Sequence, residues 1–147
     1  MDVKRVYLGS DHAGFEVKKK IKKIVLDFGY ECVDLGPFDE TSVDYPVFAK
    51  KVCDGVVEDS CFGILICGSG SGMQIAANKI KKIRAAFCYD KYSAKMARFD
   101  NDANVLTLRA RAFSSFRYKS IVKGFLKTEF SGLERHQRRI EMLDKLT

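Results

Sequence analysis

A glycine-rich segment, Leu65 to Met73 with the sequence LICGSGSGM, joins an apolar run to a candidate helix. Three kinds of chemistry suit it: a phosphate cradle, a dinucleotide-binding turn, or a reactive cysteine beside backbone amides. A Walker A loop is excluded because no Lys-Ser or Lys-Thr pair follows the glycines. The dinucleotide fingerprint needs GxGxxG, whereas the spacing here is GxGxG. Asp90 does follow at the distance of that motif's acidic residue, but the chain lacks a second domain to hold a hydride acceptor.

The reactive-cysteine interpretation uses every residue of the segment. Cys67 ends the apolar run and faces the start of a helix, where the dipole and the free N–H groups stabilise a thiolate. The glycines let successive amides approach one point. Such a base can remove a proton next to a carbonyl group while the amides stabilise the enediolate oxygen. The structural alternative is a tight strand-to-helix turn that buries a cysteine.

Two other groups of polar residues could bind a ligand. Asp11 and His12 follow the first apolar run; a helix cap would explain Asp11 but not His12, and together they form a hydrogen-bonding pair. In the C-terminal segment ERHQRRIEML, Arg135 and Arg139 share a helix face, and His136 lies beside them. With Arg111, these guanidinium groups could clamp a phosphate. The alternative for the tail is a surface basic helix or an RNA-binding patch.

The bulk properties indicate one globular domain over residues 1–147. No apolar run approaches the roughly 18 residues of a membrane span, and the N-terminus lacks a signal core, so we expect a cytoplasmic protein without a membrane partner. The cysteines form no CxxC pair, which argues against zinc or thioredoxin-like chemistry and predicts free, mostly buried thiols.

The net charge of +7 could indicate nucleic acid binding. However, the lysines of KKKIKK (18–23) and KIKKIR (79–84) are interrupted by Ile at core spacing, which is typical of solvated helix faces. An anionic small substrate also suits a basic protein. We therefore expect no nucleic acid partner.

Five apolar runs that alternate with helical patterns must position these residues. The expected strands are 4–10, 31–36, 62–67, 83–89 and 104–108, and the expected helices are 17–28, 47–58, 73–82, one within 90–102, 114–127 and 133–146. A polar loop with both prolines spans 37–46. The alternation predicts an α/β fold with a five-stranded parallel sheet, helices on both faces and a C-terminal helix. Ligands of such sheets lie beyond the carboxyl ends of the strands.

The motifs SDHAGF, DYP, ICGSGSGMQIAANK, NDANVL and RHQRR, in this order along nearly the whole chain, resemble the ribose-5-phosphate isomerase B family, which includes the galactose-6-phosphate isomerase subunits. The resemblance implies a Rossmann-like three-layer domain that acts as an aldose–ketose isomerase without metal or cofactor. It also implies a homodimer, often paired into a tetramer, in which each active site is made from two subunits.

The resemblance also implies roles for single residues. Cys67 matches the base, Ser69 the hydroxyl that assists it, and Asn101 the amide that stabilises the intermediate. The amide loop matches Gly68, Gly70, Ser71 and Gly72; substrate contacts match Asp11 and Tyr45; the phosphate site matches His12, Arg111, Arg135 and Arg139, with His136 alongside.

Two positions depart from the family pattern. The family usually has His-Asn before DANVL, with the His assigned to opening the furanose ring, whereas this chain has Asp100-Asn101. Asp100 can serve as a general acid or base there; otherwise Asp11, His12 or water must do so. Arg109 replaces a usual Gly and either adds charge near the phosphate site or faces solvent.

The favoured hypothesis is that the enzyme interconverts ribose 5-phosphate and ribulose 5-phosphate, a reaction of the non-oxidative pentose phosphate pathway, through a cis-enediolate with Cys67 as the base. The change at Asp100 motivates an alternative, an isomerase of a six-carbon sugar phosphate such as allose 6-phosphate or galactose 6-phosphate. The third hypothesis is a non-catalytic nucleotide or nucleic-acid binding module, motivated by the charge, the glycine run and Asp90.

Overall fold

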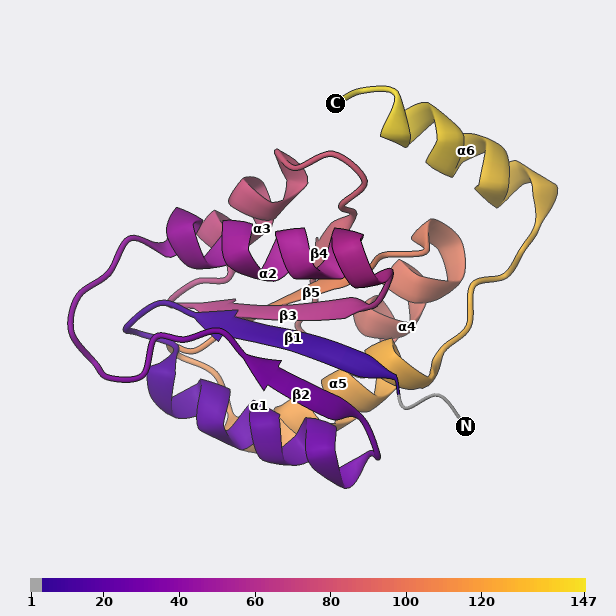
Figure 1. Cartoon of the computed structure of the whole chain (residues 1–147). Coiled ribbons are helices and arrows are strands. Elements are labelled where there is room, and N and C mark those ends of the chain that lie inside the picture. The colour runs from indigo at the N-terminus through magenta and orange to yellow at the C-terminus, as the bar shows by residue number, and fades with distance from the viewer. Residues whose placement is uncertain (1–3) are drawn as a thin grey trace.

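The computed structural model describes residues 4–147, which form one parallel sheet between two layers of helices (Figure 1). The strands are β1 (Arg5–Ser10), β2 (Glu31–Asp34), β3 (Phe62–Cys67), β4 (Ala85–Phe87) and β5 (Val105–Arg109). They lie in the order β2-β1-β3-β5-β4, and all neighbouring pairs are parallel. The predicted α/β fold with five parallel strands and a C-terminal helix is confirmed.

Helices cover both faces of the sheet. They are α1 (Phe15–Asp27), α2 (Tyr45–Asp59), α3 (Ser71–Asn78), α4 (Lys91–Asn101), the short 3-10 helix η1 (Ser115–Arg117), α5 (Tyr118–Lys127) and α6 (Glu134–Asp144). One core cluster joins α1, α4 and α5 to the sheet, and the other joins α2 and α3 to its opposite face. Figure 1 shows these two layers on either side of the strands.

The central strand β3 carries the predicted glycine-rich segment at its carboxyl end. Ile64, Leu65 and Ile66 are fully buried because helices cover both faces of the strand. The register pairs Cys67 with Arg109 at the edge of the sheet where the strands end. The segments that directly follow β3 and β5 therefore meet at this edge, where ligands of parallel sheets were expected to lie.

The predicted boundaries of α2 and α3 are wrong, and hydrogen bonding explains both. The helix expected over 47–58 begins at Tyr45, since Pro46 in its first turn needs no hydrogen bond there. The helix expected over 73–82 ends at Asn78, whose side chain donates to the carbonyl of Ala85 and accepts from its N–H. Asn78 thus joins the end of α3 to the start of β4.

Several other elements are shorter than predicted. The strand expected over 31–36 ends at Asp34, because the chain turns at Gly36 with a φ of +97°. The strand expected over 83–89 keeps only Ala85–Phe87. The helix expected over 114–127 starts as η1, and the tail helix expected over 133–146 is Glu134–Asp144.

Lys18 contradicts the prediction that the lysines of KKKIKK all lie on a solvated face. It is only 1% exposed, and its Nζ lies 2.6 Å from Oδ1 of Asp34 and 2.7 Å from the carbonyl oxygen of Pro37. A buried ammonium is stable only with such partners. Lys18 therefore ties α1 to the end of β2 and to the loop that follows.

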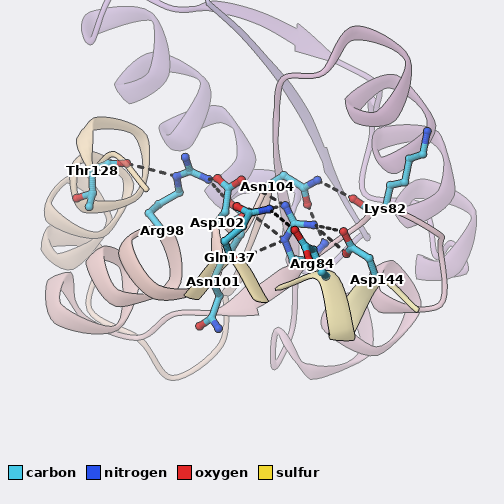
Figure 2. A network of polar contacts seen from close by, with 11 residues as sticks. Lys82, Arg84, Arg98, Asn101, Asp102, Asn104, Thr128, Gln137 and Asp144 are labelled. Carbon is cyan, nitrogen blue, oxygen red and sulfur yellow. Dashed lines mark hydrogen bonds and ion pairs between the residues drawn. The ribbon is translucent and has the colours of Figure 1, made fainter. Parts of the chain in front are cut away.

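Helix α6 stands apart from the sheet (Figure 1). It contacts α4. Arg84 holds its end: Nη1 lies 2.9 Å from Oδ1 of Asp144, and the same guanidinium donates to the carbonyls of Asn101 and Asp102 (Figure 2). This network joins α6, the end of α4 and the start of β4. Among the helices of residues 4–147, none is long and apolar enough to cross a membrane.

Candidate active site

Cys67 is the centre of the site at the carboxyl edge of the sheet. It is 3% exposed, and the N–H of Gly70 points at its Sγ, at a nitrogen–sulfur distance of 3.1 Å. Gly70 can aim its amide this way because it adopts a φ of +81°, a conformation that disfavours other residues. The first turn of α3, which starts at Ser71, adds further N–H groups that have no carbonyl partner within the helix.

Two side chains predicted to contact substrate close over this loop. A Cβ atom at Gly72 would lie 2.8 Å from Cζ of Tyr45, so the Tyr45 ring lies directly against the loop. A Cβ at Gly68 would lie 3.0 Å from Nη1 of Arg111, and the Arg111 N–H donates to the carbonyl of Gly68 at 3.1 Å. The glycines are thus needed for close approach of an aromatic ring and a guanidinium group.

Asp11 and His12 lie at the same edge, as expected. The Asp11 N–H donates to the carbonyl of Ile66 at 3.0 Å, and its carboxylate closes the turn before α1 by accepting from the N–H of Gly14 at 2.9 Å. Asp11 therefore has a structural role, but it does not cap a first-turn amide of α1. His12 accepts from the N–H of Val43 through Nδ1 at 3.2 Å, which leaves the proton on Nε2.

Ser69 is an exposed member of the loop. Its Oγ accepts from the N–H of Ser71 at 3.3 Å. The hydroxyl thus lies at the start of α3, two residues from Cys67, where a substrate can reach it.

The other four cysteines are less suited to act as bases. Burial raises the pKa of Cys53 and Cys88 to about 12, and that of Cys32 and Cys61 to about 11. They therefore stay protonated at neutral pH. All five cysteines are free thiols, three of them buried, as predicted.

Asp90, which suggested a dinucleotide, and Arg109, which was expected near the phosphate site or in solvent, both have local structural roles. Asp90 caps α4: its carboxylate accepts from the N–H of Ser93 at 2.7 Å, and Ser93 Oγ completes a capping box. These bonds lower the pKa of Asp90. Arg109 donates to the carbonyl of Ala112, and its guanidinium lies 5.4 Å from the ring centroid of Phe113, so it stabilises the loop after β5.

Asp100 and Asn101 lie at the opposite edge of the sheet from Cys67 of the same chain. Asn101 ends α4, and its carbonyl is bound by Arg84 next to the start of β4 (Figure 2). Nearby, the carbonyl of Asn104 accepts from the N–H of Gly63, four strand residues before Cys67. At about 3.3 Å per residue, these four residues place the two ends of the strands roughly 13 Å apart.

The predicted phosphate site is divided in the same way. His12 and Arg111 lie at the edge that holds Cys67, whereas α6 carries Arg135 and Arg139 as exposed side chains. His136, on the same helix, is buried and contacts Ser131 and Asp100. The structure therefore forms two clusters, one around Cys67 and one around α4 and α6.

A family model described as ribose/galactose isomerase matches residues 6–143. The chain belongs to the ribose/galactose isomerase family. Ribose-5-phosphate isomerase B of Escherichia coli is 39% identical over 142 residues, which are 96% of this chain and 95% of that protein. The enzyme of the same name from Mycolicibacterium paratuberculosis is 40% identical, with 95% of this chain and 89% of that one covered.

Solved structures of the ribose/galactose isomerase family have the same fold. The type B ribose 5-phosphate isomerase of Trypanosoma brucei has a TM-score of 0.96 at 41% identity and covers 99% of this chain and 100% of its own. The ribose 5-phosphate isomerase of Thermotoga maritima has a TM-score of 0.92 at 45% identity, covering 96% and 97%. Membership of this family confirms the prediction that the protein is an isomerase.

Two residues near the clusters were not found from the sequence. Ser131 binds His136 from the loop before α6, and Arg84 holds α6 against α4. A lone Ser in a loop gives no signal, while Arg84 was read as part of a basic helix face. Within residues 4–147, no three His, Cys, Asp or Glu side chains are grouped so that they could bind a metal ion.

Proposed function

We propose that this isomerase interconverts ribose 5-phosphate and ribulose 5-phosphate with Cys67 as the base. The observation that carries the proposal is the contact of the Cys67 sulfur with the Gly70 N–H at the start of α3, directly below Tyr45 and Arg111. The names of the similar enzymes from Escherichia coli and Trypanosoma brucei support this substrate.

The proton transfer follows from this geometry. The Cys67 thiolate removes the C2 proton of the open-chain aldose, and the electrons pass to the carbonyl oxygen O1. The Gly72 amide and the positive end of the α3 dipole stabilise the resulting cis-enediolate, while the Gly70 amide stabilises the Cys67 thiolate. Cys67 returns the proton to C1 while the proton on O2 moves to O1, with the Ser69 hydroxyl as its carrier. Asp11 and Tyr45 hold the sugar hydroxyls.

The phosphate is bound at the other end of the substrate. His12 offers an N–H from Nε2, since its Nδ1 is occupied by Val43. Arg111 adds a guanidinium group beside Gly68. We assign the remaining charge to Arg135 and Arg139, which suit an oxyanion with several acceptors.

We infer that a second copy of the chain completes the site. Asp100 and Asn101 lie roughly 13 Å from Cys67 of their own chain. Helix α6, with Arg135 and Arg139, packs beside them. These separations support a site in which a partner chain brings its own copies of these residues to Cys67. A homodimer with two shared sites meets this requirement, and two dimers could pair into a tetramer. We place this enzyme in the cytoplasm, where its five cysteines stay as free thiols.

The substrate assignment is tested with a panel of aldose phosphates. Purified protein without added metal is expected to turn over ribose 5-phosphate faster than allose 6-phosphate or galactose 6-phosphate. A strong preference for a six-carbon substrate, which the change at Asp100 would favour, would instead establish the alternative. Salt-sensitive oligonucleotide binding without any turnover would support a binding module.

The shared site predicts recovery of activity in mixed dimers. Cys67→Ala and Arg135→Ala/Arg139→Ala chains, each nearly inactive alone, are expected to regain about one quarter of wild-type activity when co-expressed in equal amounts. Half of the randomly formed dimers are mixed, and each mixed dimer has one intact site. Turnover of co-purified dimers gives the measurement. Activity no higher than that of the parents would place all of these residues in one chain's site.

A further inference from the structure

Asp100 and His136 lie side by side where α6 packs on α4. Oδ1 of Asp100 lies 3.7 Å from Nε2 of His136, which is ion-pair distance but longer than a hydrogen bond. The other ring nitrogen, Nδ1, lies 2.7 Å from Oγ of Ser131. The imidazole is buried, whereas the Asp100 side chain is 43% exposed. The accessible Asp100 carboxylate thus lies next to the His136 imidazole, which Ser131 orients.

This arrangement does not suit His136 as a phosphate ligand. Both of its ring nitrogens face residues of its own chain, and the ring of Phe99 packs edge-on against it at 6.2 Å. Arg135 and Arg139, on the same helix, are exposed instead. His136 therefore points inward toward Asp100, while its arginine neighbours face outward.

We propose that Asp100 and His136 form a carboxylate–imidazole pair that opens the sugar ring, with Asp100 touching the substrate and His136 positioning it. The inference rests on the proposed function, including the shared site. Ring opening needs a group that takes a proton from one oxygen and later returns it, and an exposed carboxylate next to an imidazole can do this. Ser131 orients the imidazole ring, so Nε2 of His136 faces the exposed Asp100 carboxylate.

The ring-opening step uses only these groups and solvent. The Asp100 carboxylate takes the proton of the anomeric hydroxyl, and the freed O–H electron pair forms the C1=O bond. The bond between C1 and the ring oxygen breaks, its electrons stay on that oxygen, and a water molecule supplies the proton that makes it a hydroxyl. Asp100 then gives its proton to the hydroxide that remains, so no net charge is gained or lost.

A double-mutant cycle at Asp100 and His136 distinguishes two roles of His136: positioning the Asp100 carboxylate, or only packing α6 against α4. Asp100→Asn is expected to lower turnover of ribose 5-phosphate about 100-fold. Asp100→His, which restores an imidazole at this position, should remain within about tenfold of the wild type. His136→Asn, whose amide can still contact Ser131, should cost about tenfold in the wild-type background but no more than about twofold beside Asp100→His.

Two results of this cycle would contradict the proposed roles of Asp100 and His136. Equal losses from His136→Asn in both backgrounds would mean that His136 only packs α6 against α4. An inactive Asp100→His chain with a normal thermal unfolding midpoint would remove ring opening from this position. If the wild type isomerises no aldose phosphate at all, the proposed function fails, and this is known before any variant is made.

A second measurement uses an open-chain substrate, for which no ring opening is needed. Ribulose 5-phosphate stays open-chain, because its phosphate occupies the hydroxyl that would close a furanose ring on C2. Exchange of its C1 proton with deuterium from solvent, followed by NMR, reports proton abstraction by Cys67 alone. Asp100→Asn is expected to leave this exchange within about twofold of wild type. A loss of exchange as large as the loss of turnover would place Asp100 in proton abstraction and contradict the proposal.

Discussion

Replacing Cys67 with alanine is expected to lower turnover of ribose 5-phosphate by at least about 1,000-fold. The variant retains the Gly-rich loop, Tyr45 and Arg111 but lacks the thiol that we propose as the base. A coupled assay of ketose formation, at saturating substrate, measures the loss in kcat. Turnover close to that of the wild type would show that another group is the base.

Two matched variants distinguish lost chemistry from lost structure. Cys67→Ser can keep the contact with the Gly70 N–H, but a serine hydroxyl does not ionise near neutral pH, so this variant should stay nearly inactive. Cys61→Ala removes a thiol next to the other end of β3 and should retain activity. Unfolding midpoints of all three variants show whether the fold is intact. A large loss of activity in Cys61→Ala would indicate a general effect of removing thiols.

Replacing Asp34 with alanine is expected to lower the free energy of unfolding by about 3–5 kcal/mol. The substitution leaves the Lys18 ammonium, 1% exposed, with the carbonyl of Pro37 as its remaining hydrogen-bond acceptor. It also removes the acceptor of the Gly36 N–H, which lies 2.9 Å from Oδ1 of Asp34. Urea unfolding at one fixed protein concentration gives the change.

Three controls define the origin of this effect. Asp34→Asn should cost less than Asp34→Ala, because the amide oxygen still accepts from Lys18. The double variant Lys18→Met/Asp34→Ala should regain most of the loss, since it buries no charge. Lys50→Ala breaks an exposed pair with Asp54 and should cost at most about 0.5 kcal/mol. A loss below about 1 kcal/mol in Asp34→Ala would show that solvent reaches Lys18.

The sequence predicted the strands of the sheet well, but it predicted the ends of some helices and strands poorly. Alternating apolar runs and helical patterns correctly predicted five parallel strands, because each strand is a contiguous apolar segment of the sequence. The end of α3 at Asn78 was missed, since it depends on Ala85 across a turn. Lys18 was assigned to solvent because its partner Asp34 lies 16 residues away.

What the sequence determined by itself is the placement of a thiol beside backbone amides at the end of β3. Cys67, the glycines and the helix that follows are contiguous, so their residue types and spacing are enough to predict a thiol beside backbone amides. The same holds for the basic face of α6, where Arg135 and Arg139 are one turn apart.

Only the tertiary structure decided which residues share a site. It places Tyr45 and Arg111 over the loop of Cys67, and it separates them from Asp100 and His136 by the length of the strands. Asp100 and His136 are 36 residues apart in sequence, and they meet only because α6 folds back onto α4. Contacts of this kind arise from packing between distant segments, and no local pattern of residue types encodes them.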